Sequence, residues 1–267
     1  MASETPTVRR ILPGDPAQLA LPEAFAFPQD HADPAGGGQS WVRAVFVASV
    51  DGAATVSGRA GGLGNATDRA VFALNRALAD VILVGAGTAR TEEYGPAEDD
   101  PQWRALRAGR SATAPLAVVS ESLALDFTAP LFTDAPADAR TIILTSESSP
   151  LAAREKAAQV AEVIVAGVDA VDFALALDRL RQRGFHRIVC EGGPSVFAEL
   201  VRAECVDELC LTRSPEIVGG TGTRIVHGPT FDPPVPLDLA SVLATDDGYL
   251  YLLYRFPAGS RSLRSRP

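Results

Sequence analysis

The residues best suited to chemistry follow a short apolar run near residue 190. Residues 188–190 are typical of a strand buried on both faces, and Glu191, Gly192 and Gly193 come directly after them. The apolar spacing of residues 195–201 then indicates a helix. A strand that ends on two glycines and continues as a helix gathers free backbone N–H groups, which can hold a pyrophosphate at the positive end of the helix dipole. The same pattern also fits a tight turn without a ligand.

Two charged side chains could act beside this turn. Glu191 places a carboxylate at the strand end, where it can accept hydrogen bonds from a heterocyclic ring, assist a proton transfer, or simply anchor the turn. Arg76 lies off the buried stripe of a helix that Asn65 can cap, so its guanidinium is free for a ligand or remains solvated. Asp51, followed by Gly52, indicates a turn first and a supporting role second.

Two further glycine-containing segments are candidates for ligand contact. Residues 57–64 form a glycine-dense loop, which fits a lid as well as a plain connection. The apolar run 81–84 ends in Gly85, Ala86, Gly87 and Thr88, which resembles a dinucleotide fingerprint. The third glycine of that fingerprint is replaced by Arg90, so the match is incomplete.

An alternation of apolar runs and helical patterns must position these residues. Strands are predicted at residues 42–50, 81–84, 115–119, 141–144, 163–165, 188–190 and 206–212, and helices after Asn65, over 171–183 and from Ser195. Residues 239–244 and 249–256 flank Asp247-Gly248, which is a hairpin signal. The sequence therefore predicts an α/β fold with a mainly parallel central sheet, helices on both faces and a C-terminal antiparallel hairpin.

Composition narrows the classes of partner. The chain has 267 residues and a formal net charge of −9, which argues against a nucleic-acid or anionic-membrane surface. No apolar run reaches the roughly 18 residues of a membrane span, and no signal peptide is visible. The three cysteines have no metal spacing and are expected to be reduced. We expect a cytoplasmic protein with a loosely ordered extension over 1–40, one domain over 41–257 and a polar tail over 258–267.

Three phrases, taken together, carry a resemblance to a known family. They are Ala48–Gly52, Arg76–Thr88 and Glu191–Pro194, in that order and spacing. The set resembles the reductase domain, the C-terminal half, of the bifunctional deaminase-reductase of bacterial riboflavin biosynthesis, over roughly residues 40 to 257. The resemblance implies the dihydrofolate reductase-like fold, NADPH as cofactor, and reduction of the ribosyl group of 5-amino-6-(5-phosphoribosylamino)uracil by hydride transfer.

The resemblance also implies the site residues. The substrate would contact Ser57, Arg76 and Glu191, and Glu191 is the candidate catalytic group. The cofactor would contact Val47, Gly85, Gly87, Thr88, Arg90, Glu92, Ser120, Gly192, Gly193, Pro194, Ser195, Val196 and Phe197. Ser122 competes with Ser120 for the adenosine end. Arg90 lies beside the glycine turn, where it could pair with the 2′-phosphate of NADPH and so favour NADPH over NADH.

The chain departs from the family pattern at several points. The His-x-Glu and Pro-Cys-x-x-Cys motifs of the zinc deaminase half are absent from the sequence, so a stand-alone reductase without metal is expected. Many family members carry a lysine where this chain has Val45, and an aspartate where it has Glu92. The resemblance therefore does not fix the identity of the substrate.

Alternatives to the riboflavin reductase remain. One is a dihydrofolate or pterin reductase on the same fold, with Glu191 or Glu92 bonding the pterin ring, and another is an NADP-binding protein without turnover. The apolar hairpin strand over residues 249–254 alternates too little for a half-exposed face, which predicts burial or cover by a partner. Because family members associate through this end, the resemblance implies a homodimer.

Overall fold

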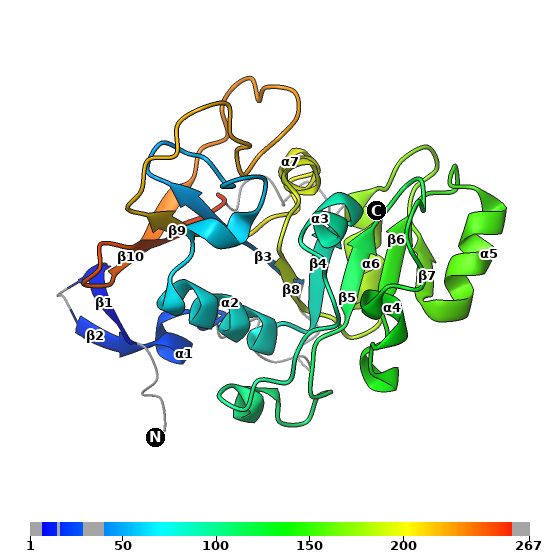
Figure 1. Cartoon of the computed structure of the whole chain (residues 1–267), viewed down its shortest axis with the longest axis horizontal. Helices are drawn as coiled ribbons and strands as arrows, with labels where there is room; N and C mark the ends of the chain where they lie inside the picture. The colour runs from blue at the N-terminus through cyan, green and yellow to red at the C-terminus, as the bar shows by residue number, and fades with distance from the viewer. Residues whose placement is uncertain (1–6, 15–16, 29–39, 258–267) are drawn as a thin grey trace.

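The computed structural model describes residues 7–14, 17–28 and 40–257, and within them one sheet runs through the molecule (Figure 1). Its strands are β1 (Thr7–Leu12), β2 (Ala17–Ala20), β3 (Trp41–Ser49), β4 (Val81–Gly85), β5 (Leu116–Val119), β6 (Ile142–Thr145), β7 (Glu162–Val165), β8 (Arg187–Cys190), β9 (Glu208–Ser214), β10 (Asp238–Ala244) and β11 (Leu250–Arg255). The strand order is β2-β1-β10-β11-β9-β3-β8-β4-β5-β6-β7.

The sheet has a parallel and an antiparallel part. The neighbours from β9 through β3, β8, β4, β5 and β6 to β7 all pair in parallel, whereas β2, β1, β10, β11 and β9 pair antiparallel. The predicted hairpin is β10–β11, in which Val242 lies opposite Leu252. The expectation of a mainly parallel sheet with a C-terminal antiparallel hairpin is confirmed.

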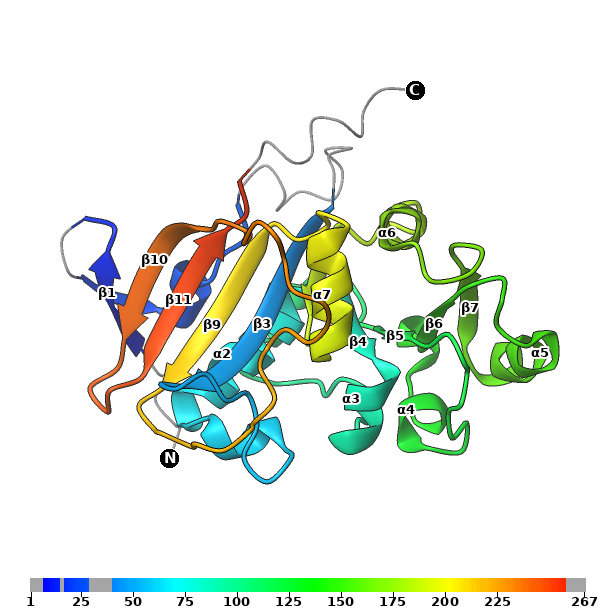
Figure 2. The ribbon, with the colours of Figure 1, turned by 90° about the horizontal axis from the view of Figure 1, so that it is seen from above.

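Helices cover both faces of the sheet. They are α1 (Leu21–Ala24), α2 (Ala66–Leu78), α3 (Ala86–Thr91), α4 (Pro130–Thr133), α5 (Leu151–Val160), α6 (Phe173–Arg181) and α7 (Pro194–Arg202), with short 3₁₀ turns η3 (Ala60–Leu63), η4 (Arg104–Arg107) and η5 (Ala137–Ala139). Val81 and Leu83 of β4 pack with α6 and α7, while Ile82 and Val84 pack with α3, α4 and α5 on the other face. Figure 2 shows α7 and α2 on opposite sides of β3.

The N-terminal segment is more ordered than expected. Residues 1–40 were predicted to be a loose extension, but β1 pairs with β10, and Leu21 and Phe25 of the α1 region are fully buried. The Phe25 ring meets the Tyr251 ring edge-on at 6.2 Å. The fully buried Arg43 donates to the Phe25 carbonyl at 2.7 Å. The sequence pattern missed these elements because their order depends on partners on distant strands.

The other differences have local causes. Helix α5 has only Ala157 buried, so it presents no apolar stripe to detect. Helices α3 and α4 are single short turns of the kind that periodicity does not resolve. The N-cap prediction is confirmed, since Asn65 accepts a bond from the Asp68 backbone N–H at 2.7 Å. Residues 1–6, 15–16, 29–39 and the predicted polar tail 258–267 lie outside the described residues. Among the described helices, none is long and apolar enough to cross a membrane.

Candidate active site

A cavity of about 790 Å³ opens at the carboxyl ends of the central parallel strands. Its wall includes Phe46 of β3, Gly85 of β4, Val119 of β5 and Glu191 directly after β8. In open α/β sheets, ligands bind in the crevice outside the carboxyl ends of the strands. The predicted site residues that line this cavity are Gly85, Gly87, Thr88, Arg90, Glu92, Ser120, Ser122, Glu191, Gly193, Pro194, Ser195 and Val196.

The two glycines after β8 are required by close packing. Gly192 has φ +91°, and a Cβ added there would lie 3.1 Å from the Phe46 ring. A Cβ added at Gly193 would overlap the Thr88 hydroxyl. The turn is bonded to the end of β4, because the Gly85 N–H donates to the Gly192 carbonyl at 2.8 Å. The peptide bond between the two glycines is cis. The strand ends of β4 and β8 therefore form one compact backbone surface.

Helix α7 begins at this surface, and the residues of its first turn line the cavity. Gly193 is its N-cap and Pro194, which has no N–H, is its first residue. The N–H groups of Ser195 and Val196 belong to the first turn, which has no intrahelical acceptors, and both residues line the cavity. The Phe197 N–H instead donates to the Gly193 carbonyl at 2.9 Å. Because the positive end of the helix dipole is here, the geometry fits a bound pyrophosphate.

Glu191 is the centre of a hydrogen-bonded cluster. Arg76 of α2 donates to its Oε1 from Nε at 2.7 Å and to its Oε2 from a terminal nitrogen at 2.8 Å. The Tyr94 hydroxyl donates to Oε2 at 2.9 Å. Arg76 also lies over the Phe72 ring at 4.5 Å. Each carboxylate oxygen can accept about two bonds, so Oε2 is filled and Oε1 keeps one lone pair.

The charges of this cluster are fixed by their surroundings. Burial acts to lower the pKa of Arg76, but the adjacent Glu191 carboxylate outweighs it and the pKa is raised. Burial, and after it the negative charge of Glu191, raises the pKa of Tyr94. Arg76 therefore stays cationic and Tyr94 stays a donor. Glu191 is held in one orientation by these three bonds, and the residue lines the cavity.

The glycine-rich loop forms another part of the cavity wall. Gly58 and Ala60 line the cavity. The Ala60 N–H donates to the Glu92 carboxylate at 3.0 Å, which ties the loop to the C-terminal end of α3. Ser57 has φ +52° and directs the turn, and it does not belong to the cavity wall.

The far end of the cavity is built from β5 and α6. Ser120, Glu121, Val171 and Phe173 line it. The Ser120 hydroxyl accepts the Leu123 N–H at 3.2 Å, so it already has a structural partner. An apolar slot with a few polar groups is the usual surrounding of a flat ring system. Arg90 stands at the same end, because its guanidinium lies 3.4 Å from the Ala124 carbonyl.

Five predicted residues lie outside the cavity wall. Phe197 packs in the core against Phe46, with ring centroids 4.9 Å apart, and Val47 pairs with Thr212 inside the sheet. Gly192, Arg76 and Ser57 do not line the cavity themselves. Gly192 precedes the lining residue Gly193 and Ser57 precedes the lining residue Gly58, while Arg76 is hydrogen-bonded to the lining residue Glu191.

Sequence reasoning missed several contributors, among them Phe46, Tyr94, Val171, Phe173 and Thr223. Tyr94 follows a residue with positive φ, Glu93, and no local pattern pairs it with Glu191. Thr223 lies on a long segment between β9 and β10, residues 215–237. Its carbonyl accepts the Ala54 N–H at 2.7 Å, and Thr223 itself lines the cavity.

Asp51 bonds to the segment that carries Thr223. Its carboxylate accepts the Gly219 N–H at 2.7 Å and the Val218 N–H at 3.2 Å, as well as the Ser49 hydroxyl. The Ser49 hydroxyl and then these backbone bonds lower the pKa of Asp51 to about 2. Asp51 is a positioning residue for the segment that carries Thr223, in line with its predicted turn role.

Known proteins of similar sequence are reductases. A 2,5-diamino-6-ribosylamino-4(3H)-pyrimidinone 5′-phosphate reductase of Aquifex aeolicus is 37% identical over 155 residues, which cover 57% of this chain and 64% of the relative. The chain thus spans less than two thirds of that relative's length. A reductase of the same name from Methanothermobacter thermautotrophicus is 34% identical over 155 residues, covering 57% of this chain and 68% of the relative.

Solved structures share the fold. A pyrimidine reductase-like protein of Corynebacterium diphtheriae superposes with a TM-score of 0.76 at 28% identity, over 89% of this chain and 98% of that one. RibD of Acinetobacter baumannii has a TM-score of 0.65 at 15% identity, over 82% of this chain and 58% of that one, which is a likeness of fold alone. The predicted α/β fold class is confirmed by these structures.

The family match covers most of the chain. Residues 40–251 match the family described as the RibD C-terminal domain. The three phrases around Asp51, Gly85 and Glu191 lie inside this range and line or support the cavity. The resemblance predicted from them is confirmed, and the chain belongs to the RibD C-terminal domain family.

Proposed function

We propose that this protein is an NADPH-dependent reductase of a 6-ribosylamino-pyrimidine 5′-phosphate in riboflavin biosynthesis, with 5-amino-6-(5-phosphoribosylamino)uracil the best single substrate. One observation carries the proposal: the end of β8 holds a pyrophosphate-type glycine turn and a buried, oriented carboxylate in consecutive residues. The names of the curated relatives and membership of the RibD C-terminal domain family support it.

Backbone groups at the start of α7 would form the binding site for the cofactor. The first-turn N–H groups of Ser195 and Val196 would hold the pyrophosphate, and Gly87 leaves open space, since nothing lies within 4 Å of an added Cβ. The apolar slot at Val171 and Phe173 would take the adenine ring. Reduced nicotinamide supplies a hydride when it is bound.

The substrate side works through Glu191. The free lone pair of its Oε1 would accept an N–H of the pyrimidine ring or its amino groups, because the bonds from Arg76 and Tyr94 fix the orientation of the carboxylate. The glycine-rich loop and the segment at Thr223 would exclude water from the reacting atoms. The protein thus supplies orientation and a dry, preorganised surrounding for the transfer.

The test is turnover with purified protein. Loss of absorbance at the nicotinamide band is followed with NADPH and, separately, the pyrimidinone and uracil ribosylamino 5′-phosphates and dihydrofolate. We expect turnover with a pyrimidine substrate. Turnover with dihydrofolate alone would make the chain a pterin reductase, and tight NADPH binding without any turnover would make it a binding protein.

Cofactor preference is a separate prediction. Arg90 is exposed at the adenosine end and can pair with the 2′-phosphate, which NADH lacks. NADPH should bind about tenfold more tightly than NADH, measured by calorimetry at fixed salt concentration, and Arg90→Gln should remove most of the difference. Equal dissociation constants for the two cofactors in the parent protein would contradict this assignment.

The organisation of the chain is proposed with the function. Residues 41–257 would form one reductase domain, to which β1, β2 and α1 add an edge. The protein would act in the cytoplasm as a homodimer.

A further inference from the structure

The adenosine end of the cavity holds a carboxylate that no step of the proposed function uses. Glu121 follows Ser120 directly after β5, and both residues line the cavity. The Glu121 Oε1 accepts the backbone N–H of Val171 at 3.3 Å. Val171 and Phe173 line the apolar slot at this end. The bond to Val171 therefore holds the Glu121 carboxylate beside the slot.

The polar groups around the slot differ in what they can still bind. The Ser120 hydroxyl accepts the Leu123 N–H at 3.2 Å. The Ser122 hydroxyl accepts the Ala124 N–H at 3.3 Å. Across residues 7–14, 17–28 and 40–257, no hydrogen bond or ion pair reaches the second oxygen of Glu121, Oε2. Because a carboxylate accepts hydrogen bonds and donates none, the slot offers its ligand a strong acceptor.

This acceptor favours a ring that carries an N–H donor at its edge. Adenine presents an amino group there, whereas hypoxanthine, on the same ring system, presents a carbonyl oxygen in its place. A carbonyl that faces the carboxylate brings two acceptors together without a proton between them, which weakens binding. A phosphate would fare worse, since two negative charges would meet. Arg90 remains the cation for the 2′-phosphate.

We infer that Glu121 accepts a hydrogen bond from the exocyclic amino group of adenine and so selects an aminated base in the dinucleotide. The inference rests on the proposed function, which supplies the bound dinucleotide. The ribose hydroxyls are the other donors at this end. A carboxylate bonded to the ribose would lie next to the 2′-phosphate and repel it, whereas at the slot it meets an uncharged ring. Glu121 is thus a specificity-determining residue for the base, and Arg90 acts on a different part of the same cofactor.

The experiment compares NADPH with its hypoxanthine analogue, in which a carbonyl replaces the amino group of the base. Dissociation constants of both reduced cofactors are measured by calorimetry, without substrate, for the parent protein and for Glu121→Gln. The parent should bind NADPH about ten- to a hundredfold more tightly than the analogue. In Glu121→Gln the two constants should lie within about threefold of each other, because an amide both accepts from an amino group and donates to a carbonyl. The amide oxygen can still accept the Val171 N–H, so the slot keeps its shape.

Glu199→Gln is the matched control. Glu199 lines the same cavity from α7 and is 54% exposed, and its substitution removes the same charge. The affinities for both cofactors should shift together in this variant, so that the ratio of their dissociation constants stays at the parent value.

The inference is overturned if the parent binds both cofactors equally, or if Glu121→Gln leaves the parent ratio unchanged. A uniform loss of affinity for both cofactors in Glu121→Gln also overturns it and assigns the carboxylate to the ribose. A fall in the ratio in Glu199→Gln as large as that in Glu121→Gln would reveal an effect of charge alone and overturn it as well. If the parent binds neither cofactor, the cofactor assignment of the proposed function has failed, and the inference fails with it.

Discussion

At the scale of single residues, Gly193 joins two parts of the site. It is the N-cap of α7, it lines the cavity, and an added Cβ would overlap the Thr88 hydroxyl. Any side chain here must displace Thr88 of α3 or reach into the cavity. The position therefore reports directly on whether the glycine turn is a ligand site.

Gly193→Val should weaken NADPH binding by about 2 kcal/mol or more, the scale of losing charge-assisted hydrogen bonds. The measurement is calorimetric titration of a variant first shown to be folded by far-UV circular dichroism. Gly95→Val is the matched control, since an added Cβ there has nothing within 4 Å and Gly95 does not belong to the cavity wall. If folded Gly193→Val bound NADPH as tightly as the parent, the Gly192-Gly193 turn would have no part in cofactor binding.

The Arg76–Glu191 pair gives a second prediction at this scale. Glu191→Gln should lower the free energy of unfolding by about 3 kcal/mol, because it leaves a largely buried guanidinium without its counter-charge. Adding Arg76→Met to it should recover part of the loss, since apolar replacement of a buried pair is well tolerated. Urea unfolding of both single variants and the double variant measures the coupling. Strictly additive losses would show that the two side chains do not depend on each other. The NADPH dissociation constant should stay near the parent value throughout.

At the scale of elements, Asp80 connects α2, β4 and β8. It is buried in the turn before β4 and accepts the backbone N–H groups of His186 and Arg187 at 3.0 and 2.8 Å. The side chains of Arg187 and Arg110 also donate to it, at 2.6 and 3.0 Å. This carboxylate fixes the start of the strand whose far end carries the site.

Stability should therefore depend on the ionised form of Asp80. Burial acts to raise its pKa, but the bonds and charge of Arg187 outweigh burial and the pKa is lowered. Because the pKa is lower in the folded protein, the ionised carboxylate stabilises the fold at pH values above its unfolded pKa of about 3.9. This stabilisation is lost as the pH falls through the folded pKa. Asp80→Asn should cost about 3 kcal/mol at pH 7, and its difference from the parent should shrink below about pH 4.

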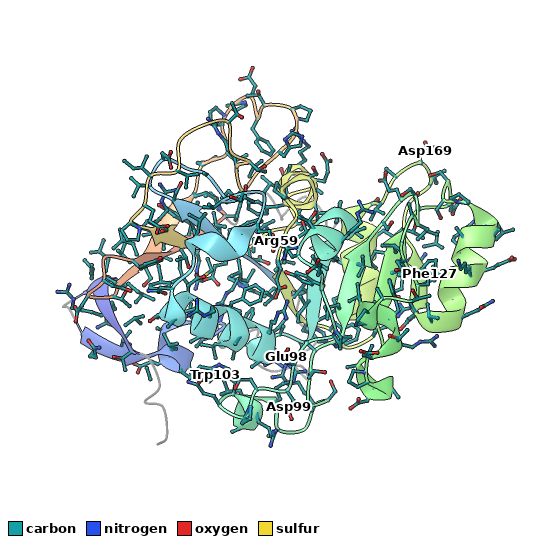
Figure 3. The ribbon with its side chains drawn as sticks, viewed as in Figure 1. Arg59, Glu98, Asp99, Trp103, Phe127 and Asp169 are labelled. Carbon is teal, nitrogen blue, oxygen red and sulfur yellow. The ribbon has the colours of Figure 1, made fainter. Side chains whose placement is uncertain are left out.

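The measurement is urea unfolding of the parent protein and of Asp80→Asn, each at pH 7 and below about pH 4. Asp169→Asn serves as the control, because Asp169 is exposed at the opposite end of the sheet from β1 (Figure 3). A pH-independent difference between Asp80→Asn and the parent would contradict the assigned charge.

The elements differed in how well the sequence predicted them. Buried strands such as β4 and β8 were found because their apolar runs are local, and the Gly192-Gly193 turn was found because it interrupts such a run. The bond between Arg76 and Glu191 spans 115 positions, and no local pattern encodes it. Tyr94 was missed for the same reason. The order of β1 and β2 depends on β10, more than 200 residues away, so the N-terminal sequence alone gave no sign of it.

At the scale of the whole molecule, the outer face of the hairpin is apolar. Tyr251 and Leu253 point into the core, whereas Leu239 and Leu250 are 47% and 37% exposed. Leu252 lies half-buried with them, opposite Val242. Exposed apolar surface on a regular sheet face is typical of an interface between copies of a chain.

We expect a homodimer through this face. Light scattering at about micromolar concentration should give twice the chain mass for the parent protein, and Leu250→Asp should give a single chain mass because it places like charges near a two-fold interface. Val235→Asp is the control, as Val235 is exposed outside the hairpin. A single chain mass for the parent would contradict the dimer.

The placing of Glu191 beside Gly193 has a thermodynamic consequence. Under the proposed function, the group that binds the pyrimidine and the turn that binds the pyrophosphate are separated by one residue, Gly192, whose carbonyl is bonded to β4. A shift that one ligand imposes on this short, firmly bonded backbone segment also moves the group that binds the other ligand. Cofactor and substrate are then linked, each raises the affinity for the other by the same factor, and that factor is independent of the order of binding.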